Sequence, residues 1–92
     1  PLNGTTLLHE ACRHGHSSVA SLLLSMNAHV NVTNHAGFTP LMVAARWGGG
    51  NAVRVLLSHG ADVSAELPDG KTALDLALAA RREQAHRDQN AA

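Results

Sequence analysis

The chain has 92 residues and a mass of 9.6 kDa, which is enough for one small domain. Hydrophobic residues make up 45% of it, but Phe38 and Trp47 are its only Phe, Tyr or Trp residues, so the core must be aliphatic. The seven basic and seven acidic residues cancel, which argues against a sequence-independent nucleic-acid binder and against an electrostatic membrane anchor. No apolar run approaches the roughly 20 residues that span a membrane.

The sequence repeats itself at an offset of 33 residues. Glycine, threonine, leucine and alanine recur at equivalent positions, and the Leu-Leu-Ser of residues 23–25 recurs at residues 56–58. A fixed period of this size is typical of a solenoid, in which each unit buries its apolar face against the next. The positions that coincide in three units are Gly4, Gly37 and Gly70; Thr6, Thr39 and Thr72; Leu8, Leu41 and Leu74; and Ala11, Ala44 and Ala77.

Each unit is predicted to begin with a short helix. The recurring threonine suits its N-cap, because the hydroxyl can accept a hydrogen bond from a free backbone N–H two or three residues on. Pro40 then stands at the first helical position, where its missing N–H costs nothing. Gly15 and Gly48 are expected to end this helix. The expected N-caps are Thr6, Thr39 and Thr72.

A second helix is predicted over residues 17–26 of the first unit and residues 51–59 of the second. Asn27 and Gly60 follow at the position that favours a left-handed backbone. Turns at residues 34–37 and 67–70 are expected to connect one unit to the next. The predicted apolar faces are Val19, Leu22 and Leu23 in the first unit and Ala52, Val55 and Leu56 in the second.

The second unit carries Gly-x-Thr-Pro-Leu at residues 37–41 and Leu-Leu-x-x-Gly-Ala-Asp-Val at residues 56–63. A unit of turn, helix and helix with these motifs resembles the ankyrin repeat. The resemblance implies an all-α solenoid of stacked helix-turn-helix units joined by β-turn or hairpin-like loops. It covers residues 2 to about 80 and implies a repeat domain over residues 1–80, with repeats at about 4–36 and 37–69 and a partial repeat at 70–80. The departures from the family pattern are Leu7 for proline, Met42 for histidine and His29 for aspartate.

The repeat pattern fails in residues 81–92. Arg81 stands where the repeat has its glycine, and the Leu-Leu of a second helix never arrives. One interpretation is a polar extension of the last helix, or a frayed tail, that caps the solenoid. The other is a third repeat cut by a boundary.

The family resemblance implies a protein-binding module, a scaffold or adaptor, that uses the concave face made by its turns and first helices. Both aromatic residues fall on that face and are not expected in the periodic core, and Trp and Arg are enriched where interfaces concentrate their energy. Two alternatives stay open. Trp47 only shields the neighbouring helix while Phe38 covers the turn, and Arg13 and Arg46 form a solvated face and not a carboxylate site. The expected partner-binding residues are Arg13, His14, His35, Phe38, Arg46, Trp47, Asp69 and Lys71; Asn3, Thr5, Ala36, Pro68, Ala79 and Ala80 occupy further positions of the same kind.

Metal binding and catalysis are both weakly supported. His9, Cys12 and His16 have spacings that would suit zinc on one helix face. However, Cys12 aligns with Ala45, which indicates a small buried hydrophobic residue. His9 matches a family position at which the histidine ring forms hydrogen bonds to neighbouring turns. The glycines at residues 48–50 lack the lysine of a phosphate loop. We therefore expect no metal, no cofactor, no catalytic residue and no enzyme activity.

The expected partner is another protein or peptide, with no nucleic acid and no membrane. The chain is expected to be a monomer, either a complete domain or a fragment of a longer chain. The alternative is a structural domain that packs against another domain of its parent chain or self-associates. A lone cysteine and the lack of a signal-peptide pattern favour the cytoplasm or nucleus.

Overall fold

The computed structural model describes the backbone of residues 4–90 and the side chains of residues 4–83. Over this range all regular secondary structure is helical and there is no strand, which confirms the predicted fold class. The helices are α1 (Leu7–Arg13), α2 (Ser17–Ser25), α3 (Pro40–Val43), the π-helical η1 (Ala44–Gly48) that continues α3, α4 (Gly50–Ser58) and α5 (Ala73–Asn90).

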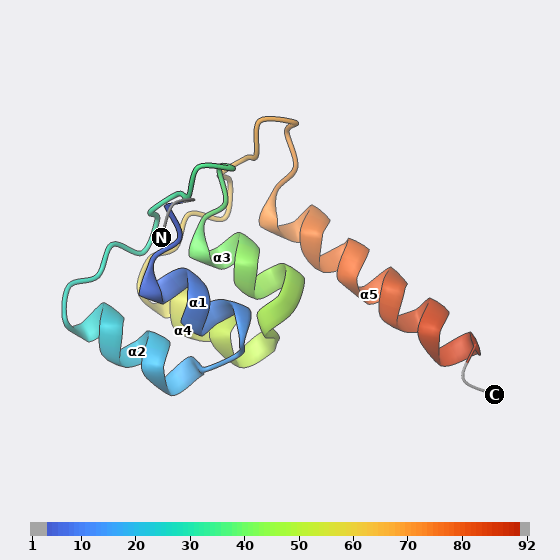
Figure 1. Cartoon of the computed structure of the whole chain (residues 1–92), viewed down its shortest axis with the longest axis horizontal. Helices are drawn as coiled ribbons and strands as arrows, with labels where there is room; N and C mark the ends of the chain where they lie inside the picture. The colour runs from blue at the N-terminus through green and yellow to red at the C-terminus, as the bar shows by residue number, and fades with distance from the viewer. Residues whose placement is uncertain (1–3, 91–92) are drawn as a thin grey trace.

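The helices form two rows, as the repeat predicts. The first helices of the units, α1, α3–η1 and α5, lie side by side, and the second helices α2 and α4 pack together below them (Figure 1). Within the described part of the chain the third unit has a first helix but no second one, because α5 runs on to Asn90. No helix among the described residues is long and apolar enough to cross a bilayer.

The three threonines cap the first helices as predicted. Each hydroxyl oxygen accepts a hydrogen bond from the backbone N–H three residues on, at 3.3, 3.2 and 3.4 Å for Thr6, Thr39 and Thr72. In return, a side chain of the first turn accepts a hydrogen bond from the backbone N–H of each capping threonine. Nδ1 of His9 accepts from the Thr6 N–H at 3.1 Å, and Oδ2 of Asp75 accepts from the Thr72 N–H at 2.9 Å. These reciprocal bonds satisfy donors that a helix start leaves free.

The predicted helix ends and turns are also confirmed. Asn27 and Gly60 follow the second helices with φ angles of 69° and 83°. The N–H groups of Gly37 and Gly70 close the two connecting turns, donating to carbonyl oxygens three residues earlier at 3.0 and 2.8 Å. Each turn is therefore a tight loop at the edge of the first-helix row.

The core is aliphatic, with one correction. Phe38 was expected outside the periodic core, but its half-buried ring packs against both core clusters and so joins them. The smaller cluster holds Met42, Leu67 and Leu76. The larger cluster holds Leu8, Ala11, Cys12, Ala20, Leu24, Leu41, Val43, Ala44, Ala52 and Leu56.

The predicted apolar face of α2 is wrong. Leu22 is 60% exposed and Val19 is also exposed, while Ala20 and Leu24 are buried. The reason is the position of α2 at the end of its row: it packs only against α1 and α4, and its other side faces solvent. In α4 the prediction holds, because Ala52 and Leu56 face α2 and are fully buried.

Candidate functional site

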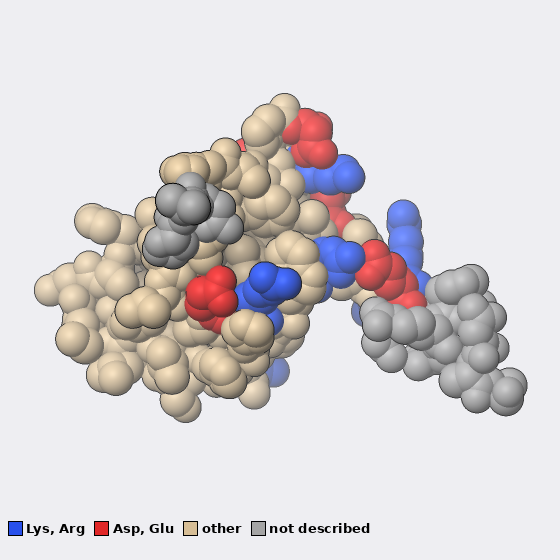
Figure 2. Space-filling model, in the orientation of Figure 1, with Lys and Arg blue, Asp and Glu red and all other residues tan. Residues whose placement is uncertain are grey.

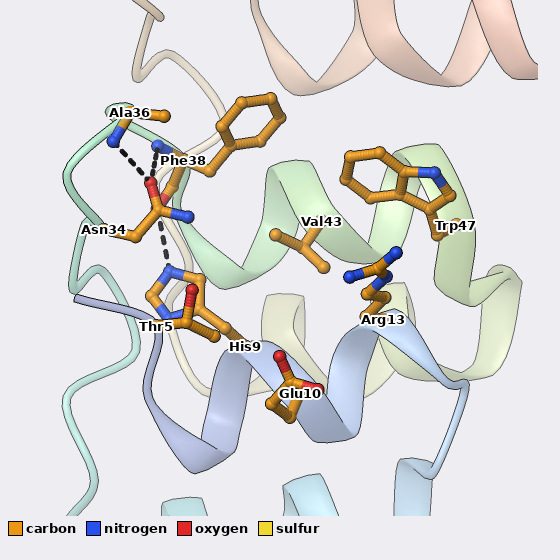
Figure 3. A pocket seen from close by; sticks show the side chains of 9 residues that line it. All are labelled: Thr5, His9, Glu10, Arg13, Asn34, Ala36, Phe38, Val43 and Trp47. Carbon is orange, nitrogen blue, oxygen red and sulfur yellow. Dashed lines mark hydrogen bonds between the residues drawn. The ribbon is translucent and has the colours of Figure 1, made fainter. Parts of the chain in front are cut away.

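A pocket of about 190 Å³ opens between α1, the turn before α3 and the α3–η1 helix (Figure 3). Five of its lining residues, Thr5, Arg13, Ala36, Phe38 and Trp47, were predicted to lie on the concave face. Four others were not predicted: His9, Glu10, Asn34 and Val43.

One wall of this pocket is a cluster of aromatic rings and guanidinium groups. The rings of Phe38 and Trp47 lie 5.9 Å apart, centre to centre. The guanidinium groups of Arg13 and Arg46 lie 5.5 and 5.4 Å from the centre of the Trp47 ring, within the range of a cation–π contact. Trp47 remains 49% exposed, so half of its surface is open to solvent despite these contacts.

The two arginines have different roles. Nη2 of Arg46 donates to both carboxylate oxygens of Glu83 on α5, at 2.8 and 3.0 Å. This ion pair fixes α5 beside η1. Arg13 directs its guanidinium into the pocket between Val43 and Trp47 (Figure 3), where a ligand can reach it.

The opposite wall is fixed by hydrogen bonds to the backbone. Oδ1 of Asn34 accepts from the N–H groups of Ala36 and Phe38, both at 3.0 Å (Figure 3). Nε2 of the buried His9 donates to the carbonyl oxygen of Phe38 at 2.8 Å. Because Nδ1 of the same ring accepts from the Thr6 N–H, Nε2 is the ring nitrogen that donates. The expected bond of this ring to a neighbouring turn is thereby confirmed.

Asp69 and Lys71 lie in a second hollow of about 390 Å³, which shares Ala36 and Phe38 with the first. Oδ1 of Asp69 accepts from the Lys71 N–H at 3.1 Å, and the Lys71 ammonium lies 3.9 Å from Oδ2. The two hollows therefore form one continuous surface that crosses Phe38. We call this surface the concave face and define it by Arg13, Ala36, Phe38, Trp47, Asp69 and Lys71.

His14 and His35 line neither hollow. Nε2 of His14 lies 3.5 Å from the Glu10 carboxylate, one helical turn earlier on α1. The His35 ring lies so close to Gly4 that a side chain at residue 4 would meet it. Asn3 falls outside the described residues, and Ala79 and Ala80 lie half-buried on α5.

The sequence held signals for two of the lining residues that were missed. Glu10 stands one helical turn before Arg13 on the same helix face. Asn34 precedes a turn glycine by three residues, and a side chain of this kind often bonds its own turn. The charged residues did not indicate the position of the pocket. The surface in Figure 2 is mainly uncharged, with acidic and basic side chains side by side.

Cys12 is unsuited to act as a nucleophile. It is fully buried, and this burial raises the pKa of its thiol from 9.0 to about 11, so the reactive thiolate is scarce at neutral pH. Among the residues that the structure describes, no three His, Cys, Asp or Glu side chains are grouped so that they could hold a metal ion.

The geometry is that of a repeat solenoid, and comparison with known proteins identifies its family. Residues 1–67 match the family model described as ankyrin repeats (three copies). The chain belongs to the ankyrin-repeat family, as its motifs predicted. Repeats of this family are generally non-catalytic protein–protein interaction modules.

Three relatives show how the repeats occur in longer proteins. The chain is 37% identical over 75 residues to protein phosphatase 1 regulatory subunit 12A of Mus musculus, covering 82% of this chain and 7% of the mouse protein. It is 42% identical over 84 residues to ankyrin repeat and KH domain-containing protein 1 of Homo sapiens, covering 91% and 3%. It is 42% identical over 71 residues to the probable E3 ubiquitin-protein ligase XBOS33 of Oryza sativa subsp. japonica, covering 76% and 14%. The chain thus spans a small fraction of each relative.

Proposed function

We propose that this chain is a protein-binding module whose concave face holds a segment of another protein. The observation that carries the proposal is the arrangement of Trp47, half-exposed between two guanidinium groups at the mouth of a pocket. Partly exposed aromatic residues beside an apolar hollow are typical of the few positions that supply most of the energy of an interface. Binding is the whole of the proposed activity; no catalytic step is included.

The mechanism is rigid presentation. The backbone at Phe38 is bonded to Asn34 and His9, and Trp47 is packed against Phe38 and two arginines. These residues need little further ordering when a partner arrives, so less of the interaction energy is lost to conformational entropy. The partner alone has to order its segment.

The pocket also limits the chemistry of the partner. Its apolar part, made by Val43 and the two aromatic rings, suits one apolar side chain. At its rim Arg13 offers hydrogen bonds to a carboxylate, and Glu10 can accept from a donor. A carboxylate would be bound by Arg13 and not by a pair of arginines, since Arg46 is already engaged by Glu83.

A selection from a displayed peptide library, followed by single substitutions, tests the proposal. Peptides selected on the unaltered chain are measured against Trp47→Ala and against Leu22→Ala, which removes an exposed side chain of α2 outside both hollows. We expect Trp47→Ala to weaken binding by about 30-fold, equivalent to about 2 kcal/mol, and Leu22→Ala to leave it unchanged.

Circular dichroism of each variant shows whether the fold is intact. Unchanged affinity of the selected peptides for a folded Trp47→Ala chain would refute the concave face as the binding surface. Sedimentation velocity separates the proposal from the structural alternative: a folded monomer supports an independent module, whereas a self-associating chain supports a packing role. We propose that the module acts as a monomer in the cytoplasm or nucleus.

A further inference from the structure

A second apolar surface lies at the end of the solenoid, where no described helix covers the side of α4 that bears Val53 and Leu57. It is a groove of about 260 Å³, and it shares no residue with the two hollows of the concave face. We call it the edge groove and define it by Leu41 and Ala45 of α3–η1, Val53 and Leu57 of α4, and Ala73 and Ala77 of α5.

The repeat shows what this groove is shaped to hold. The residues 33 positions before these six are Leu8, Cys12, Ala20, Leu24, Pro40 and Ala44. All six are buried, and all but Pro40 share the larger core cluster with Ala52 and Leu56 of α4, which are fully buried themselves. The edge groove is the next step of the same interface, and it is left uncovered over the part of the chain that the structure describes.

The described residues after α4 do not supply a second helix for this position. The counterpart of α4 one unit later is residues 83–91, which continue the line of α5 as far as Asn90. Their sequence has Ala85 where α4 has Ala52, but Gln89 where α4 has Leu56. Without that leucine the segment has little apolar area to bury, and Figure 1 shows α5 leading away from α4.

A second copy of the chain does not fit the groove in register either. In the internal interface α1 and α2 move together as one unit, and α1 lies against α3 and η1. A copy whose α2 covered α4 would bring its α1 to the side of α3–η1 where α5 already packs. The edge groove can therefore accommodate one helix but not a whole helix-turn-helix unit.

We propose that the edge groove binds a single amphipathic helix of another protein, which presents an alanine-sized and a leucine-sized side chain four positions apart. That pair reproduces Ala52 and Leu56 in the internal interface. The surface around the groove fits this occupant, because Leu57, Leu74 and Val63 expose large apolar side chains there. A charged or extended peptide would leave them exposed.

The probe is a peptide with the sequence of α4, held helical by a covalent staple between the positions of Arg54 and Ser58, which are exposed in α4. Fluorescence anisotropy measures its binding to the full chain. We expect saturable binding that Leu57→Asp weakens by about tenfold or more, since burying a carboxylate beside a leucine is unfavourable. A peptide with aspartate in place of the leucine that corresponds to Leu56 should not bind.

Three controls make the outcome specific. Leu22→Asp, on the exposed side of α2, and Trp47→Ala, on the concave face, should both leave peptide binding unchanged, so this test stands apart from the proposed function. Leu74→Asp, at an exposed position of α5, repeats the test of Leu57→Asp from the other wall of the groove. Circular dichroism verifies that each variant is folded.

Absence of saturable binding, or binding that neither Leu57→Asp nor Leu74→Asp reduces, overturns the proposal. It is also overturned if the chain alone forms a dimer in sedimentation velocity that Leu57→Asp abolishes. That result would make a second copy the occupant of the groove.

Discussion

Gly15 and Gly48, which end the first helices of two neighbouring units, bring two backbones into direct contact. A Cβ atom at Gly15 would lie 2.8 Å from the Gly48 carbonyl oxygen. A Cβ atom at Gly48 would overlap the carbonyl oxygen of Cys12. The repeat of glycine at these positions is therefore a packing requirement between units, and it adds to their role in ending the helices.

Gly48→Ala is expected to destabilise the fold by about 3 kcal/mol or more, because the obstacle is backbone and cannot rotate away. Gly50→Ala is the matched control, since a Cβ atom there has nothing within 4 Å and its φ is ordinary. That variant should gain about 0.5 kcal/mol from the lower entropy of the unfolded chain. Urea unfolding measures both. Equal effects of the two substitutions would contradict the close approach.

Cys12 should make stability fall at alkaline pH. Its pKa is raised from 9.0 to about 11 in the folded chain, so the unfolded chain loses its thiol proton at a lower pH. The thiol's contribution is complete below about pH 9 and is lost as the pH rises through 11, which amounts to about 1 kcal/mol at pH 10. Unfolding free energies at pH 8 and pH 10 measure the loss. Cys12→Ala should lack this part of the pH dependence, and an identical dependence in that variant would disprove the assignment.

The local structure at several single residues could be predicted from the sequence alone. The threonine caps, Pro40 and the left-handed Asn27 and Gly60 were predictable because each depends on its own backbone conformation and near neighbours in the chain. Phe38 was misjudged because its burial depends on contacts with both core clusters, one of which includes Leu76 of the third unit. No local rule contains that information.

At the scale of helices, α2 and α4 have matching sequences but bury different sides. Leu24 and Leu57 occupy the same position of the repeat, yet Leu24 is 7% exposed and Leu57 is 45% exposed. The difference arises from neighbours: α4 covers Leu24, and no helix of the described residues covers Leu57. Sequence periodicity identifies the apolar positions, but it does not say which of them face an adjacent helix.

Leu24→Ala should therefore cost at least 2 kcal/mol more than Leu57→Ala, although the two leucines are equivalent by sequence. Removing a buried leucine costs about 2–5 kcal/mol, whereas a half-exposed one loses much less. Chemical denaturation of the two variants gives the comparison directly. Similar costs would mean that Leu57 is covered in solution, by self-association or otherwise, and sedimentation at the same concentration would identify which.

At the scale of the whole molecule, η1 is the centre of the fold. It packs against α1, α3, α4 and α5, so every unit meets it. The concave face depends on this arrangement, since Trp47 of η1, Arg13 of α1 and Phe38 of the preceding turn meet only after the units stack. The repeat predicted the general surface, but the pocket required distances between residues far apart in sequence.

Because η1 links all units, the chain should unfold in one cooperative step. Trp47 fluorescence reports the centre of the molecule and far-ultraviolet circular dichroism reports all helices. The two urea transitions should coincide within error, as expected for a small two-state protein. A circular dichroism transition at lower urea than the fluorescence transition would show instead that an outer unit unfolds separately.

The constant 33-residue spacing of the faces that join the units also has a genetic consequence. A recombination event that duplicates the codons of residues 37–69 would preserve the reading frame and would add a unit with the same two faces. The new unit would pack on α3–η1 and α4 as these pack on α1 and α2, while α5 would move outward to close the longer array. Such a chain can lengthen by whole 33-residue units, and each added unit would be compatible with the existing fold from the start.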